Sequence, residues 1–184
     1  MIYIFEGARN SGKTFLSDYT SKTFGVHKFK FDFVNYFKGL KLTSENSRET
    51  HFFAMGKELM LMQLSRDLGI EDFILDRGII TVFSWALLEK RITEEEVKSQ
   101  IKFICDNRLM DGISIIYVEG DNPDGSSRNK DIWDQFDSNP EEKKWCDFVI
   151  NEFEINGFKI LYFRNNFSVK DLENIKIVFG SLKN

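Results

Sequence analysis

A glycine-rich octet near the start of the chain carries residue types that suit phosphate binding. Residues 7–14 read "GARNSGKT" and fit the pattern G-x-x-x-x-G-K-[ST]. In such a loop the backbone N–H groups face an anion, Lys13 reaches the β- and γ-phosphates, and the Thr14 hydroxyl ligates Mg²⁺. The residues expected to bind the phosphates are Gly7, Ala8, Arg9, Asn10, Ser11, Gly12, Lys13 and Thr14. The octet therefore predicts a site for a nucleoside triphosphate and Mg²⁺.

Asp76 and Arg77 form a second candidate group, at the end of the apolar run "DFILDRG" (72–78). Ligands of open parallel sheets lie at the carboxyl ends of the strands, which is where these two residues are expected. Asp76 is placed to hold Mg²⁺ through water, and Arg77 could clamp a phosphoryl group. The alternative interpretation of the pair is a surface salt bridge.

Other motifs narrow the class of phosphate-binding protein. Guanine-specific GTPases need N-K-x-D, and the nearest stretch is "NKDI" at 129–132, which ends in Ile132. No D-x-x-G follows the loop. Motor and transporter ATPases are normally longer and carry further motifs. A short chain with the loop near its N-terminus therefore indicates a nucleoside or nucleotide kinase.

The apolar pattern predicts strands that alternate with helices. Strands are expected at 2–6, 27–33, 72–78, 113–120 and 158–163. Helices are expected at 13–24, 48–68, 79–90, from a T-x-x-E capping box at Thr93 to about 109, from about 138 to 156, and after a cap of Ser168 with Asp171. The run of Met55, Met60 and Met62 is expected to pack in the core. Five strands alternating with helices predict an α/β chain with a mainly parallel sheet covered on both faces.

Three features together resemble the thymidylate kinase-like nucleotide kinases. They are "FEG" leading into the glycine loop, "DR" after the third strand, and a basic loop after the fourth strand, "IIYVEGDN". The resemblance implies a P-loop three-layer sandwich with a five-stranded parallel sheet, helices on both faces and a lid loop at about 121–137. It also implies transfer of the ATP γ-phosphate to a nucleoside monophosphate.

The resemblance places one more arginine in the site. "SSRNKDIWDQF" (126–136) is similar to the family's lid, so Arg128 would close on the transferring phosphate, with Lys130 a weaker candidate. An ordinary polar turn is the alternative. The chain departs from thymidylate kinases at Arg9, where the family usually keeps an aspartate that holds the acceptor sugar. The difference at Arg9 argues against thymidine monophosphate as the substrate. It does not affect the prediction of kinase chemistry.

The acceptor is expected to lie near Asp32, Phe33, Arg48 and Arg77. In deoxynucleoside kinases a carboxylate just after the second strand acts as base for the sugar 5′-hydroxyl, and Asp32 stands in that place. A monophosphate acceptor is already anionic and needs cationic clamps, which Arg48 and Arg77 could supply. Phe33 could stack on the acceptor base or pack in the core. Arg48 could equally be solvated.

Composition limits the partners. At 184 residues and a net charge of −4, the chain has the size of a single domain, residues 1–184, and lacks the basic balance typical of proteins that bind long nucleic acids. Cys105 and Cys146 have neither disulfide nor metal spacing, which suits reduced thiols. No apolar stretch approaches the ~20 residues that span a bilayer, and "MIYIF" is too short for a signal peptide. We therefore expect a cytoplasmic protein with small nucleotide partners and no membrane partner.

The sequence thus predicts a nucleoside monophosphate kinase that uses ATP and Mg²⁺. Its expected catalytic residues are Lys13, Arg77, Arg128, Asp76 and Asp32, and its expected metal-binding residues are Thr14 and, through water, Asp76. The alternatives are a (deoxy)nucleoside kinase, a kinase of a nucleic-acid hydroxyl, and an ATP-binding regulatory module without transfer activity. Thymidylate kinases are commonly dimers, so the resemblance allows a homodimer.

Overall fold

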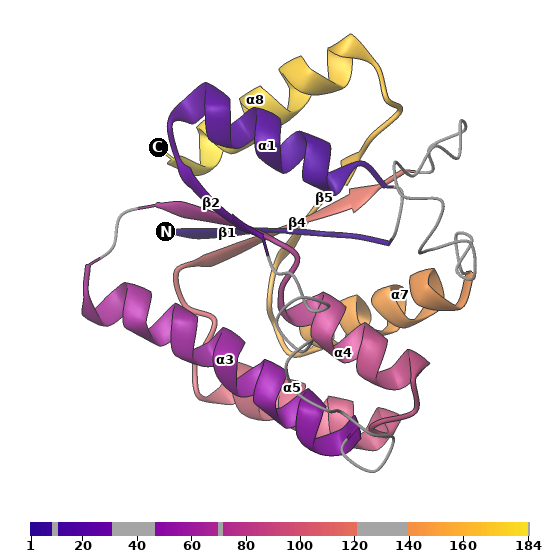
Figure 1. The fold of residues 1–184 in the computed structure, drawn as a ribbon. Helices are drawn as coiled ribbons and strands as arrows, with labels where there is room; N and C mark the ends of the chain where they lie inside the picture. The colour runs from indigo at the N-terminus through magenta and orange to yellow at the C-terminus, as the bar shows by residue number, and fades with distance from the viewer. Residues whose placement is uncertain (9–10, 31–46, 70–71, 121–139, 184) are drawn as a thin grey trace.

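The computed structural model describes residues 1–8, 11–30, 47–69, 72–120 and 140–183 (Figure 1). Within these residues five strands form one parallel sheet, and each expected strand is present. The strands are β1 (Ile2–Glu6), β2 (His27–Lys30), β3 (Phe73–Asp76), β4 (Ile113–Glu119) and β5 (Ile160–Arg164). Their order in the sheet is β2-β3-β1-β4-β5, so the strand that leads into the glycine loop lies at the centre.

Helices cover both faces of this sheet. They are α1 (Lys13–Phe24), α3 (Ser47–Asp67), α4 (Ile79–Leu88), α5 (Glu94–Asp106), α7 (Pro140–Ile155) and α8 (Val169–Lys183). Figure 1 shows α1 and α8 on one face and α3, α4, α5 and α7 on the other. The predicted α/β fold, with a parallel sheet between two helical layers, is therefore confirmed.

The core is divided by the sheet into two clusters, because successive strand residues point to opposite faces. Tyr3 and Phe5 of β1 join the cluster beneath α1 and α8. Ile2 and Ile4, which alternate with them, join the larger cluster beneath α3, α4, α5 and α7. All five residues of β1 are buried. The continuous apolar run of this strand is thus explained by a sheet covered on both faces.

The N-terminal ends of α5 and α8 follow the predicted caps. The capping box of α5 is present, since the Thr93 side chain accepts from the Glu96 N–H and the Glu96 carboxylate accepts from the Thr93 N–H (2.9 Å). The helix ends at Asp106 and not at about 109, because the chain turns there and Arg108 takes a left-handed conformation (φ 55°). At α8 the Asp171 carboxylate accepts from the Ser168 N–H (2.9 Å), as expected for a cap.

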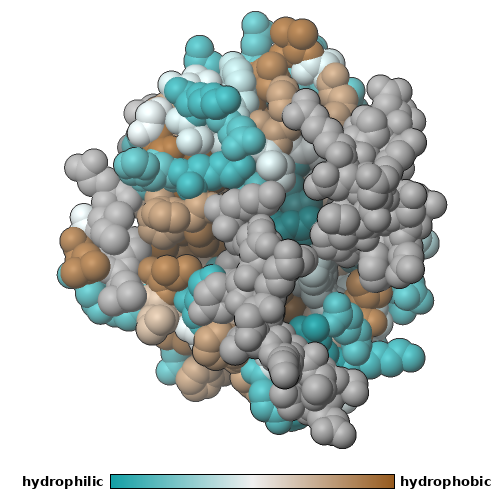
Figure 2. Space-filling view, viewed as in Figure 1, coloured by the Kyte–Doolittle hydropathy of each residue, from teal (hydrophilic) through white to brown (hydrophobic). Residues whose placement is uncertain are grey.

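The prediction for the methionines is right for two and wrong for one. Met55 and Met62 are buried, whereas Met60 is 57% exposed. Met55 and Met62 are two helical turns apart and share the inner face of α3, while Met60 falls on the outer face. In the space-filling view, hydrophilic atoms gather over α1 and hydrophobic atoms lie lower down, toward α3 (Figure 2). No helix in the described ranges is long and apolar enough to cross a membrane.

Candidate active site

The glycine loop lies at the carboxyl end of β1, and two glycines give it its shape. Gly7 (φ 146°) and Gly12 (φ 83°) both take positive φ values that side chains rarely adopt. A side chain at Gly7 would overlap the Val118 carbonyl of β4, and one at Gly12 would overlap the Asn165 amide. Gly12 also stands at the N-cap of α1. The loop is therefore packed tightly between β4, β5 and α1, as a preformed anion site requires.

Asn165, which follows β5, holds the loop through a hydrogen bond. This residue was not predicted from the sequence. Its side-chain amide donates to the Ser11 carbonyl (2.8 Å), and its backbone N–H donates to the Glu119 carbonyl (2.7 Å). The residue is 4% exposed. A polar residue directly after the last strand was the available signal, because the carboxyl ends of all parallel strands meet at this edge. Asn165 fixes the loop backbone that faces the ligand.

Lys13 is buried at the start of α1, and its ammonium turns back over the loop. Its Nζ donates to the Ala8 carbonyl at 3.0 Å. Burial, followed by the nearby charge of Arg77, lowers the pKa of Lys13 to about 7. Ser11 Oγ is buried beside it and has no hydrogen-bond partner among the described residues. A buried cation and an unpartnered hydroxyl in one loop fit an anionic ligand.

Thr14 and Asp76 meet at the same edge of the sheet. β1 and β3 pair in the register Phe5–Asp76, which brings Asp76 beside the start of the loop. The Thr14 hydroxyl donates to Asp76 Oδ1 (3.2 Å), and Asp76 is only 1% exposed. The alternative of a surface salt bridge at Asp76 is therefore wrong. The two residues predicted to bind the metal do lie together.

Lys28 of β2 is a further charged group here that the sequence did not reveal. Its Nζ lies 3.1 Å from Asp76 Oδ2 and 2.6 Å from Asp18 Oδ1 on α1. The contact with Asp76 is ionic, since Oδ2 accepts no hydrogen bond from the described residues. The strand pattern "HKFK" suggested only alternation, and only the pairing of β2 with β3 brings this lysine to Asp76. Lys28 balances the buried carboxylate.

The donor set at this point fits Mg²⁺. The Thr14 hydroxyl and the Asp76 carboxylate are hard oxygen donors, and Oδ2 of Asp76 accepts no hydrogen bond from the described residues. Mg²⁺ commonly takes one or two protein oxygens together with water and substrate phosphates. Within the described ranges no group of three or more His, Cys, Asp or Glu side chains is arranged to hold a metal ion. The site therefore suits a metal brought with a nucleotide better than an all-protein cage.

Arg77 follows Asp76 and is held in an unusual backbone conformation. Its φ is 77°, and its N–H donates to the Phe5 carbonyl of β1 (3.0 Å). A positive φ in a non-glycine residue costs about 1–3 kcal/mol and is concentrated at functional sites. The guanidinium lies 5.5 Å from the centre of the Trp85 ring of α4, and Nη1 lies 4.0 Å from Glu142 Oε1 of α7. Arg77 is thus directed by contacts from two helices.

Glu6 connects the glycine loop with the turn at Asp76 and Arg77. Its Oε1 accepts from the Ile80 N–H (2.9 Å), and its Oε2 accepts from the Thr81 hydroxyl (2.6 Å). Burial raises the pKa of this fully buried carboxyl. The residue that precedes the glycine loop therefore caps α4, the helix that follows the Asp76–Arg77 turn. The "FEG" motif has a structural reason, because Glu6 fixes that turn relative to the loop.

Glu58 on the inner face of α3 is a second buried glutamate that the sequence did not indicate. It is 0% exposed, and neither carboxylate oxygen has a hydrogen-bond partner among the described residues. Burial, and next the charge of Glu6, raise its pKa to about 8. At neutral pH this side chain is therefore mainly the protonated acid. A hydrophobic helical pattern gave no signal for it.

Arg48, predicted to receive the acceptor, contacts α5. Its guanidinium forms an ion pair with Glu96, and it lies 5.5 Å from the centre of the Phe52 ring. The bond from Arg48, followed by the Thr93 N–H, lowers the pKa of Glu96 to about 2. The structure therefore brings Lys13, Thr14, Asp76 and Arg77 together and directs Arg48 toward α5.

Several predicted site residues lie outside the described residues. They are Arg9, Asn10, Asp32, Phe33 and Arg128, together with Lys130 and the rest of the expected lid at 121–137. Their predicted roles stay predictions. Gly7, Ala8, Ser11 and Gly12 of the loop are described and have the positions given above.

No family model matches the chain, and no curated protein matches it in sequence. Solved structures do match in fold. Over the whole of both chains, a deoxyadenosine kinase from M. mycoides with bound dATP has a TM-score of 0.64 and 17% identity. A thymidylate kinase from Candida albicans has a TM-score of 0.62 and 16% identity over 99% of this chain and 92% of its own.

A third solved structure also covers nearly the full length. The YorR protein from Bacillus subtilis, in complex with phosphorylated GDP, has a TM-score of 0.52 and 19% identity over 98% of this chain and 95% of its own. At these identities the likeness shows the fold. The chain therefore has the three-layer α/β fold that these three structures share.

Proposed function

We propose that this protein is a P-loop kinase that transfers the γ-phosphate of ATP to a nucleoside or a nucleoside monophosphate. The observation that carries the proposal is the meeting of Thr14 and Asp76, whose side chains are 3.2 Å apart beside the buried Lys13. A glycine loop, a lysine, a hydroxyl and a buried carboxylate together form the recurring arrangement of P-loop phosphoryl transfer. The shared fold supports the same class.

In the proposed reaction each described side chain has one role. Lys13 and the loop N–H groups bind the β- and γ-phosphates and stabilise the charge that develops on them. Mg²⁺, held by Thr14 and through water by Asp76, would supply further neutralisation of the phosphates. Arg77 stabilises the transferring group from the other side. The acceptor oxygen attacks the γ-phosphorus in line, and ADP leaves.

Two versions of the proposal differ in the acceptor, which is either a nucleoside monophosphate or a nucleoside. The sequence favours a monophosphate through Arg48 and Arg77, with specificity like that of thymidylate kinases, and favours a nucleoside through Asp32. A hydroxyl nucleophile benefits from a base, whereas a phosphate nucleophile needs cations. Arg48 forms an ion pair with Glu96 of α5, so one of the two cations proposed to bind an acceptor phosphate is directed toward α5. This observation favours the nucleoside acceptor, with Asp32 as the base that takes the hydroxyl proton.

A panel of nucleosides and nucleoside monophosphates, assayed with ATP and Mg²⁺ for ADP formation, tests the proposal. We expect at least one acceptor to raise ADP formation well above the rate with ATP alone. ATP binding without any stimulation by an acceptor would instead support a regulatory ATP-binding module. An adventitious ATPase would show the same rate with every acceptor.

The Asp32→Asn variant separates the two acceptors. If a nucleoside is the substrate, this variant should lose about 10²-fold or more in kcat, since general base catalysis contributes that much. If a monophosphate is the substrate, the loss should be small and Arg77→Met should cost more. Arg48→Gln serves as the control, and we expect it to leave the KM for a nucleoside unchanged.

The remaining expectations belong to the same proposal. We propose that residues 1–184 act as one kinase domain, that Arg128 closes on the transferring phosphate, and that the protein works in the cytoplasm on free nucleotides. Sedimentation at micromolar concentration would distinguish a monomer from the homodimer that the resemblance allows.

A further inference from the structure

Arg77 contacts side chains from two helices, and these contacts form a small connected group. The Trp85 indole of α4 lies against the guanidinium, with 5.5 Å between the Arg77 Cζ and the ring centre. Glu142 Oε1 of α7 accepts a hydrogen bond from the Trp85 indole N–H (3.3 Å). The same oxygen lies 4.0 Å from Arg77 Nη1. One carboxylate oxygen therefore accepts from the indole and lies near the guanidinium over the ring.

The charges of this group are largely removed from water. Glu142 is 2% exposed, although it lies in the first turn of α7. The Arg77 side chain is 21% exposed, and its Nη1 is buried without a hydrogen-bond partner among the described residues. Charges this deeply buried are normally paired. Glu142 is the carboxylate that pairs with Arg77 from the α7 side.

The group limits the directions that the guanidinium can take. The Trp85 ring lies on one side of the guanidinium and Glu142 lies beside its Nη1, so the two contacts together restrict the directions open to it. The left-handed backbone at Arg77 sets where the side chain starts. Helices α4 and α7 pack against each other in the same hydrophobic cluster, so both contacts rest on a rigid base.

We propose that Glu142 is a positioning residue that, together with Trp85, orients the Arg77 guanidinium toward the transferring phosphoryl group. This inference rests on the proposed function, since it assigns a support to Arg77 in that reaction. Glu142 does not touch the substrate and acts through Arg77. A misplacement of about 1 Å at a catalytic group can lower the rate by about 10²-fold.

A double-mutant cycle between Glu142 and Arg77 gives the kinetic test. We expect Glu142→Ala to lower kcat/KM by about 100-fold and Glu142→Gln, which keeps an acceptor for the indole, by about tenfold. In the Arg77→Met background, Glu142→Ala should add less than about twofold, because residues that act as one unit are not additive. An equal loss in both backgrounds would overturn the proposal.

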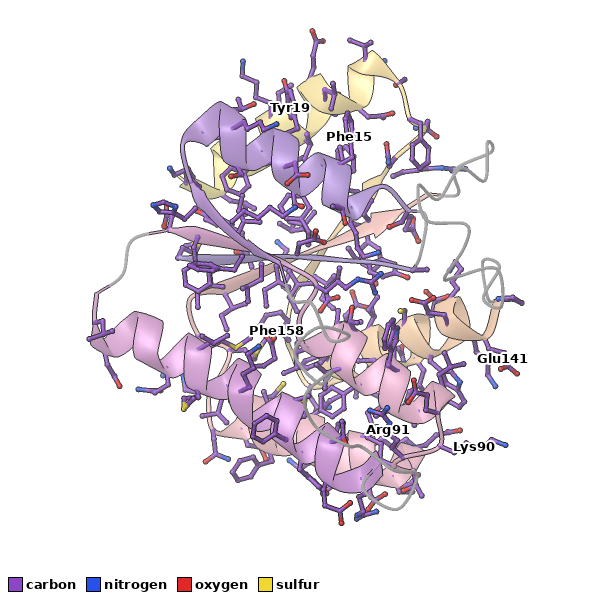
Figure 3. All side chains as sticks on the ribbon, viewed as in Figure 1. Phe15, Tyr19, Lys90, Arg91, Glu141 and Phe158 are labelled. Carbon is purple, nitrogen blue, oxygen red and sulfur yellow. The ribbon has the colours of Figure 1, made fainter. Side chains whose placement is uncertain are left out.

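Glu141→Gln is the matched control. Glu141 is the preceding residue of the same turn, is exposed, and points outward from α7 (Figure 3). It undergoes the same charge change at an exposed side chain of the same helical turn. We expect kcat/KM of this variant to stay within about twofold of the wild type. Thermal melts of all variants would test whether the fold is retained. If Glu142→Ala is unfolded, Glu142→Gln, which preserves the side-chain shape, carries the test.

The emission of Trp85 gives a second readout that does not depend on turnover. The chain has three tryptophans, so Trp133→Phe and Trp145→Phe leave Trp85 as the sole reporter. We expect both Glu142→Ala and Arg77→Met to shift the Trp85 emission maximum, and Glu141→Gln to leave it unchanged. A wild type that is inactive with every acceptor would overturn the proposed function, whereas unchanged Trp85 emission in Glu142→Ala would overturn the positioning role.

Discussion

The two edges of the sheet handle charge in opposite ways. At the amino edge the Met1 ammonium lies 2.6 Å from Asp72 Oδ1, and Lys183 Nζ lies 3.5 Å from the other oxygen of Asp72. These groups are partly exposed, at 44%, 29% and 31% of their side chains. At the carboxyl edge Lys13, Asp76 and Glu6 are all nearly or fully buried. Like chemical groups therefore stand in water at one edge and in the protein interior at the other.

The two edges also differ in their buried polar atoms. At the amino edge the Asp72 carboxylate is paired with both the Met1 ammonium and Lys183. At the carboxyl edge, Ser11 Oγ, Asp76 Oδ2 and Arg77 Nη1 are buried without hydrogen-bond partners among the described residues. Buried polar groups in native proteins are nearly always satisfied, so these three atoms suit contact with a ligand at this edge. The described residues also include such atoms on other elements, at His51 and Glu58 of α3 and at Arg91 after α4. Perturbed titration, as at Lys13, is a second mark of such an edge.

Removal of the loop lysine should give the largest effect. Lys13→Ala should lower kcat by about 10³-fold or more, because the variant loses the ammonium that stabilises the phosphates. The fold should persist, since burial lowers the pKa of Lys13 to about 7 and its charged form is costly in the folded state. ADP formation and circular dichroism measure the two outcomes. Wild-type activity in a folded Lys13→Ala protein would remove the P-loop assignment.

Breaking the buried ion pair of the carboxyl edge should give the next largest effect. Lys28 and Asp76 are 11% and 1% exposed at their side chains, and Lys28→Met leaves the Asp76 carboxylate buried without its cation. We expect a loss of about 3–5 kcal/mol in the free energy of unfolding. Urea denaturation measures it. Asp18→Asn, which removes only the exposed partner of Lys28, should cost under about 1 kcal/mol, and equal losses would contradict the comparison.

The buried Glu58 of α3 should make the free energy of unfolding depend on pH. Burial and the Glu6 charge raise its pKa to about 8, and the charge of Lys57 acts in the opposite direction. Between about pH 5 and 8 the unfolded chain has lost this proton and the folded chain still holds it, so wild-type stability falls as the pH rises. Relative to wild type, Glu58→Gln should therefore gain up to about 1.4 kcal/mol per pH unit in this window.

Urea unfolding at three pH values between 5.5 and 7.5 measures the gain. Glu49→Gln, an exposed change on the same helix, is the control and should follow the wild type at every pH. Parallel stability curves for Glu58→Gln and the wild type would show that Glu58 is ionised in the folded protein.

The smallest effect is expected at the amino edge. Asp72→Asn removes the partner of both Met1 and Lys183, yet all three groups are partly exposed. We expect a loss of under about 1 kcal/mol in the free energy of unfolding. The loss should shrink further in 1 M salt, whose screening length is about 3 Å. A loss in the free energy of unfolding as large as that of Lys28→Met would contradict the expected difference between the exposed and the buried ion pair.

Much of the fold was predictable because its signals are local. Alternation and apolar runs set the strands, and the capping box at Thr93 set the start of α5 in advance of any tertiary contact. The end of that helix was less predictable, since it depends on a left-handed turn at Arg108 without a glycine signal. Met60 shows the same limit, because the outer face of α3 follows from packing against the sheet and not from hydrophobicity.

The site was predictable where its residues belong to one continuous motif. The octet indicated Lys13 and Thr14, and the end of a strand indicated Asp76 and Arg77. The sequence did not indicate three further residues, because each contacts a partner from a distant part of the chain. They are Lys28, Asn165 and Glu142. A lone charged or amide residue in a strand or helix resembles an ordinary surface residue until the elements are assembled.

The sequence by itself therefore determined the position of the glycine loop, the order of strands and helices along the chain, and the edge of the sheet where ligands should lie. These depend on short-range geometry, which a run of neighbouring residues fixes. Tertiary structure alone decided that Lys28 pairs with Asp76, that Glu142 lies beside Arg77, and that Arg48 pairs with Glu96. The physical reason is that burial and pairing of charge depend on which elements pack together, and the parallel sheet sets that packing across the whole chain.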